Sequence, residues 1–214
     1  MDFIVPTWPA PPNVQARVTL REMGDMAGEE GRGELDGILL HPPIWLRQVH
    51  GTTVIDADSP PPSPSGDAAF SRKRGTACAV MIADCMPVFF TDGATVAVAH
   101  AGWRGLAAGV LEATLAAMKA DPAQVICWLG PAIGPKVYEV GEDVRAALAG
   151  YESAFTPTRP GHWLLDLYAV ARERLKGVKG IYGGGLCTYS EPKRFFSFRR
   201  DKSAERMAAL IWLT

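Results

Sequence analysis

Three short segments of the chain each carry one strong ligand for a transition metal: His50, Cys85 and His100. Two imidazoles and one thiolate are ligands that zinc prefers, and three protein ligands leave one position of a tetrahedral ion open. An open position is typical of a catalytic rather than a structural metal site. The segments are RQVHG at 47–51, ADCMP at 83–87 and AHAGWRG at 99–105.

A predicted hairpin brings two of these ligands together. Asp92-Gly93 separates two apolar runs and is a strong signal for a two-residue turn. Such a turn places Cys85 directly opposite His100, with Cβ atoms roughly 4.5–5.5 Å apart on one face of the sheet. His50 would reach the same cleft from the end of a separate strand, predicted over 44–49.

Charged residues near the ligands are candidates for substrate binding and proton transfer. Arg104 stands near the expected start of a helix, where free N–H groups favour an anion such as phosphate, although an ion pair with a carboxylate is an equally good interpretation. Arg47 and Arg199 are further candidate substrate ligands. Asp84 is the obvious proton carrier, but neighbouring strand residues point to opposite faces, so it would need an irregular backbone. Asp67 is the alternative carboxylate and a further candidate substrate ligand.

Composition indicates one cytoplasmic domain spanning 1–214. The chain has 48% apolar residues and a net charge of −1, so no electrostatic feature favours nucleic acid or an anionic membrane. The longest apolar stretch is too short to span a bilayer. The four cysteines form no CxxC pair, which argues against a disulfide framework and for a reducing compartment.

The pattern of elements predicts an α/β (α+β) fold in which helices pack on a mixed sheet. Helices do not alternate strictly with strands, so a Rossmann fold is disfavoured. The expected strands cover 15–20, 44–49, 53–57, 77–82, 88–91, 95–99, 125–129 and 195–198. The expected helices cover 106–119, 142–149, 164–176 and 203–213.

The chain resembles the YfiH-type laccase-domain family, whose members are variously called multicopper polyphenol oxidases and purine nucleoside phosphorylases. The resemblance covers 44–213. It implies a zinc-binding set at His50, Cys85 and His100. It also implies phosphorolysis of adenosine, inosine and methylthioadenosine, with adenosine deamination as a further activity. The motifs are RQVHG, GDAAF, ADCMP, AHAGWRG, WLGPAIGP, YEVG, CTYS and FFSFRRD.

The chain also departs from the family pattern in two places. Residues 21–41 are shorter and more acidic than the usual N-terminal section. A Thr-Gly-Arg segment that usually follows FFSFRRD is replaced by SAER at 203–206.

Four kinds of function follow from these residues. One is a non-enzymatic structural metal module, but its closed site would need a fourth protein ligand, and the sequence suggests none. The leading hypothesis is a zinc-dependent purine nucleoside enzyme with Cys85, His100, Asp84 and Arg104 as catalytic residues and a purine nucleoside and phosphate as partners. The second is copper redox chemistry, with Met86 as a thioether ligand. Four histidines are too few for a multicopper cluster. The third is a metal-free hydrolase in which Cys85 is the nucleophile and His100 the base. Such a dyad would not need His50.

Overall fold

A six-stranded mixed sheet forms the centre of the molecule. The computed structural model describes residues 3–214. Met1 and Asp2, which the predicted domain includes, lie outside the described residues. In spatial order the strands are β12 (Gly180–Gly183), β8 (Ile126–Leu129), β6 (Met86–Thr91), β7 (Val96–Ala101), β4 (Ala68–Ser71) and β3 (Val54–Asp56). The outer pairs β12–β8 and β3–β4 are parallel and the inner pairs are antiparallel.

Two further sheets and six helices complete the described fold. The second sheet is antiparallel and contains β1 (Phe3–Ile4), β2 (Val14–Thr19), β13 (Met207–Leu213) and β5 (Cys78–Ile82). The third sheet contains β10 (Phe155–Pro157), β11 (His162–Leu165) and β9 (Glu139–Gly141). The helices are α1 (Glu29–Gly33), α2 (Trp103–Ala108), α3 (Val110–Met118), α4 (Glu142–Ala147), α5 (Leu167–Arg174) and α6 (Phe198–Asp201).

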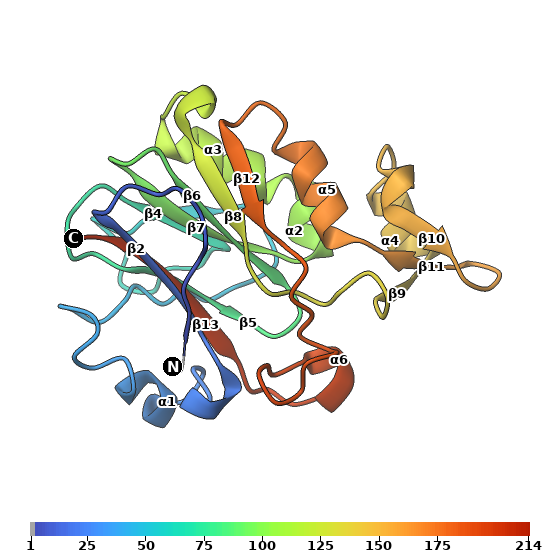
Figure 1. Cartoon of the computed structure of the whole chain (residues 1–214), viewed down its shortest axis with the longest axis horizontal. Helices are drawn as coiled ribbons and strands as arrows, with labels where there is room; N and C mark the ends of the chain where they lie inside the picture. The colour runs from blue at the N-terminus through green and yellow to red at the C-terminus, as the bar shows by residue number, and fades with distance from the viewer. Residues whose placement is uncertain (1–2) are drawn as a thin grey trace.

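Alternating side chains of the central sheet build two cores. In β6, Val88 and Phe90 point toward the helices and join the core that includes residues of α2, α3 and α5. Phe89, between them, points the other way and packs with residues of β2, β5 and β13. Figure 1 shows these helices and the four-stranded sheet on opposite sides of the central strands. The predicted mixed α+β fold is therefore confirmed.

The short N-terminal section covers the outer face of the four-stranded sheet. Met23, Met26 and Leu35 pack there against Leu210 and Trp212. This section therefore closes a third, smaller core on the far side of that sheet from the central one.

Several predicted elements were wrong. Residues 203–213, predicted as a helix, contain β13, which pairs with β2 on one side and β5 on the other and has all seven side chains buried. Residues 44–49 form isolated bridges rather than a strand. Residues 195–198 lead into α6 instead of forming a strand. The helix predicted over 106–119 is two helices that meet at Gly109, whose φ is 96°.

The described residues, 3–214, contain no helix both long and apolar enough to cross a membrane.

Candidate active site

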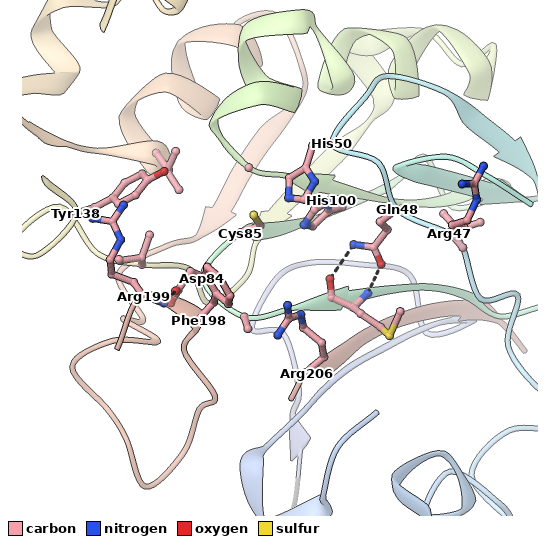
Figure 2. Close-up of a pocket in the computed structure, with 16 residues that line it drawn as sticks. Arg47, Gln48, His50, Asp84, Cys85, His100, Tyr138, Phe198, Arg199 and Arg206 are labelled. Carbon is pink, nitrogen blue, oxygen red and sulfur yellow. Dashed lines mark hydrogen bonds between the residues drawn. The ribbon is translucent and has the colours of Figure 1, made fainter. Parts of the chain in front are cut away.

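The structure brings the three predicted metal ligands together. The nitrogen and sulfur atoms that His50, Cys85 and His100 offer all lie within 4.8 Å of one another. The two imidazole rings meet edge to face with their centroids 4.9 Å apart. Figure 2 shows the three side chains converging at one side of a pocket.

The hairpin that carries two of the ligands has a different register from the predicted one. His100 pairs with Pro87, because residues 92–95 form a four-residue loop instead of a two-residue turn. The Asp92 carboxylate stabilises this loop by accepting two of its backbone N–H groups, at 2.9 and 2.7 Å. A shift of two residues preserves the face of a strand. Cys85, which directly precedes β6, therefore still reaches His100, diagonally rather than directly.

Asp84 occupies the irregular backbone position that its predicted role required. Its φ is 93°, a left-handed value that is uncommon outside glycine. This turn allows Asp84 and Cys85 both to line the pocket. The Asp84 carboxylate accepts the hydroxyl of Thr188 on Oδ1 and the backbone N–H of Arg199 on Oδ2, both at 2.6 Å. It therefore fastens the Cys85 turn to the start of α6.

Asp67 holds both of the predicted metal-ligand histidines in place. It accepts the backbone N–H groups of Val49, His50 and Gly51 at 3.1, 2.9 and 2.7 Å, and so fixes the turn in which His50 has a φ of 60°. Its Oδ1 also lies 2.9 Å from Nδ1 of His100. Asp67 has no exposed surface, which distinguishes it from a residue that contacts substrate.

The ionisation of Asp67 determines which nitrogen of His100 is free. Burial raises the pKa of the Asp67 carboxyl, but hydrogen bonds from His100, Gly51 and Val49 outweigh burial and keep this pKa below its usual value. The carboxylate is ionised, so Nδ1–H of His100 donates to it. Nε2 is then the nitrogen left for a metal ion, which would displace the proton that Nε2 carries.

Cys85 and His100 also shift each other's pKa. Burial raises the pKa of the Cys85 thiol, but the charges and hydrogen bonds of His100 and His50 outweigh burial and lower it to about 6. Burial lowers the pKa of His100, whereas the Cys85 thiolate and Asp67 raise it to about 9. The sulfur is thus stabilised as a thiolate, which is the form that binds metals.

The chemistry and spacing of the three donors fit a metal ion. A Cβ atom on Gly102 would lie 2.7 Å from Sγ of Cys85 and 3.5 Å from Cδ2 of His50, so glycine is needed here to leave room for the cysteine sulfur. A donor set of two imidazoles and one thiolate suits zinc. Met86, the predicted thioether ligand for copper, packs instead in the helix-side core. The donors that converge therefore fit zinc with one open position.

A pocket of about 550 Å³ opens beside the ligands. Sequence reasoning identified some of its lining residues and missed Gln48, Tyr138, Phe198 and Arg206. Gln48 donates to the backbone carbonyl of Met81 and accepts its N–H, at 2.9 and 2.7 Å, which clamps the His50 segment to β5 (Figure 2). The lining residues are Leu46, Arg47, Gln48, His50, Met81, Ala83, Asp84, Cys85, His100, Gly102, Ile133, Tyr138, Leu167, Phe198, Arg199 and Arg206.

Of the three arginines predicted to bind an anion, two line the pocket and one does not. Arg47 and Arg199 line the pocket, as does Arg206. Arg104 is exposed at the start of α2, and its guanidinium lies 4.3 Å from the centroid of the Trp103 ring, outside the pocket lining.

The contacts of Asp67 lead to a testable prediction. We expect Asp67→Asn to lower zinc affinity by about tenfold to a hundredfold, the usual effect of losing a partner that orients a metal-bound histidine. The amide would also present N–H groups to backbone donors, so a lower melting temperature is expected. Competition titration with a chromogenic chelator measures the first effect and thermal unfolding the second. Unchanged zinc affinity would contradict the orienting role.

Comparison with known proteins identifies the family. Residues 31–214 match the family described as multi-copper polyphenol oxidoreductase laccase. The purine nucleoside phosphorylase of Xylella fastidiosa (strain Temecula1) is 44% identical over 250 residues, covering 98% of this chain and 96% of that protein. The purine nucleoside phosphorylase YfiH of Escherichia coli K12 is 44% identical over 239 residues, covering 99% and 98%.

A solved structure agrees with these matches. The crystal structure of Neisseria meningitidis protein NMB0706 superposes with a TM-score of 0.94 at 41% identity, over 100% of this chain and 99% of that one. The fold, the motifs and the full-length similarity lead to one conclusion: the chain belongs to the YfiH-type laccase-domain family.

Proposed function

We propose that this protein is a zinc-dependent purine nucleoside phosphorylase acting on adenosine, inosine and methylthioadenosine, with adenosine deamination as a further activity. The observation that carries the proposal is the convergence of His50, Cys85 and His100 at the edge of a pocket lined by aromatic and guanidinium groups. The names of the relatives, which match nearly the whole chain, support it.

The pocket has the size and chemistry that a nucleoside and phosphate need. Its volume of about 550 Å³ lies in the range typical of small-molecule sites. Tyr138 and Phe198 offer aromatic surface for a base, and Arg47, Arg199 and Arg206 offer positive charge for phosphate. Guanidinium groups suit phosphate because their planar fork makes two parallel hydrogen bonds.

The metal would be held by His50, Cys85 and His100 and would supply Lewis acidity at its open position. Asp67 would orient His100 to bind the ion through Nε2, because its carboxylate accepts a hydrogen bond from Nδ1–H. Gly102 keeps the space beside Cys85 clear.

The residues of the pocket suit phosphorolysis. A phosphate oxygen forms a bond to C1′ of the ribose while the bond from C1′ to N9 breaks, and the purine leaves with the electron pair and takes up a proton. The arginine charges hold the phosphate and stabilise the developing charge. Arg199 is fixed for this role, because its Nη1 donates to the carbonyl of Glu139 at 2.8 Å. Arg104 lies outside the lining, and its charge lowers the pKa of Tyr138 against the larger effect of burial.

Two groups can handle protons in the pocket. Burial raises the pKa of Tyr138 above its usual value, so the phenol stays protonated and donates a hydrogen bond to the ligand. Asp84 is the carboxylate among the lining residues. In deamination, water adds to C6 of the purine and ammonia leaves, and Asp84 carries the proton from the water to the leaving nitrogen.

The metal-free alternative rests on the same pair of residues. A Cys85 thiolate next to a protonated His100 also suits a nucleophile and its base. That mechanism gives no role to His50, although the backbone N–H groups of its turn donate three hydrogen bonds to the Asp67 carboxylate. The zinc mechanism uses all three side chains, and we favour it for this reason.

The proposal is tested by identifying the products that the protein forms from adenosine. Protein of known zinc content is incubated with adenosine, with and without phosphate, and the products are separated by chromatography. We expect adenine and ribose 1-phosphate only when phosphate is present, and inosine in its absence at a lower rate. If no purine nucleoside is converted by protein with full zinc occupancy, the proposal is wrong.

A further inference from the structure

Phe198 is an exposed aromatic residue at a place where the fold does not require one. Its side chain is 51% exposed, and it is the aromatic member among the large hydrophobic side chains that are exposed within residues 3–214. It lines the same pocket as the three metal-ligand residues. An aromatic ring left open to a pocket is typical of a ligand-binding surface rather than a core.

The ring is held on a fixed support. Phe198 is the first residue of α6, whose second residue, Arg199, donates its backbone N–H to Asp84 at 2.6 Å. The hydroxyl of Ser197, just before the helix, accepts the backbone N–H of Arg200 at 3.2 Å. Asp84 directly precedes Cys85, so the aromatic surface is tied to the turn that carries a metal ligand. Figure 2 shows Phe198 beside Asp84.

The charges around the ring indicate which ligand it would bind. Exposed aromatic rings bind either cations or flat, electron-rich rings. The Nζ atom of Lys202 and the guanidinium carbon of Arg206 lie 5.6 and 5.8 Å from the centre of the Phe198 ring, and these positive charges repel a cationic ligand. A neutral heteroaromatic base is not repelled, and its attached sugar can bring phosphate close to the arginines.

We propose that Phe198 is the surface on which the purine base of the substrate stacks, and that it sets the affinity for the nucleoside. This inference rests on the proposed phosphorolysis of purine nucleosides. The residue acts on the base and not on phosphate, so its replacement should affect the two substrates unequally.

The test is steady-state kinetics of Phe198→Ala with adenosine and phosphate varied separately. Replacement of a stacking aromatic residue by alanine usually weakens base binding by about tenfold to a hundredfold, so the KM for adenosine should rise by this factor. The KM for phosphate should change less than about twofold and the zinc content should stay the same. Phe198→Trp should restore the low KM for adenosine, because it restores a flat ring.

Leu40→Ala is the matched control, because Leu40 is 83% exposed and lies outside the pocket lining. It should leave both KM values unchanged. The inference is overturned if the wild type is active and Phe198→Ala keeps its KM for adenosine, or if the KM for phosphate rises instead. If the wild type converts no purine nucleoside, the proposed function fails, and the stacking role fails with it. The wild-type assay therefore distinguishes the two failures.

Discussion

Replacement of His50 by alanine is expected to remove zinc from the protein and to reduce phosphate-dependent cleavage of adenosine by at least about a hundredfold. Loss of a residue that merely orients a metal ligand already costs about tenfold to a hundredfold, and His50 is a proposed ligand itself. The fold should survive, because the side chain is exposed and its backbone N–H is bound by Asp67 in either variant. Metal analysis of the purified variant and the adenosine assay measure the two effects.

His41→Ala is the control for this experiment, since His41 is also an exposed histidine but lies outside the cluster of three ligands. It should keep both the metal and the activity. The experiment also separates zinc chemistry from a metal-free pair of Cys85 and His100. A His50→Ala variant that lacks zinc and retains full activity would support that pair and contradict our proposal.

Replacement of Gly102 by alanine should reduce the cleavage of adenosine about as strongly as replacement of His50. The Cβ atom of Gly102→Ala would lie 2.7 Å from Sγ of Cys85, far inside normal contact, so the sulfur has to move by about 1 Å. A displacement of about 1 Å in a catalytic site commonly costs about a hundredfold in rate. The backbone itself accepts alanine, because Gly102 has a φ of −75°. We therefore expect kcat/KM for adenosine to fall about a hundredfold, with weakened zinc binding.

Gly33→Ala provides the comparison, since no atom lies within 4 Å of the added Cβ at that position. It should behave as the wild type in the adenosine assay and in zinc titration. The far-UV circular dichroism of Gly102→Ala should match that of the wild type, which attributes its loss to the site and not to unfolding. Wild-type zinc affinity in Gly102→Ala would show that Cys85 does not need the space that glycine provides.

The candidate metal ligands could be selected from the sequence because metal binding depends on residue type, and the structure brings the three together. The approach of Cys85 to His100 also followed from one predicted hairpin, even though its register was wrong by two residues. Asp92 accepts two backbone N–H groups and extends the turn, which the Asp92-Gly93 pair alone does not reveal. The wrong register did not change the predicted approach of Cys85 to His100. Strand faces alternate with a period of two, so a shift of two residues keeps both side chains on one face.

Other parts of the site and the fold could not be predicted from local sequence. The alanine and methionine residues of 203–213 favour a helix, but burial on both faces and pairing with two strands outweigh that preference in β13. Asp67 is 33 residues from His100 and 17 from His50, so only the folded chain reveals that it contacts both. Phe198 and Arg206 likewise enter the pocket through the tertiary fold, from residues with no ligand pattern of their own.

The most direct test of the proposed zinc centre is to remove the metal from the wild-type protein and to restore it. The zinc content per chain and the rate of phosphate-dependent adenine release are measured on one preparation, before dialysis against a chelator, after it, and after addition of Zn²⁺. We expect one zinc ion per chain, loss of activity in proportion to loss of zinc, and recovery when one equivalent is returned. Full adenine release by metal-free protein would contradict a catalytic zinc centre at His50, Cys85 and His100.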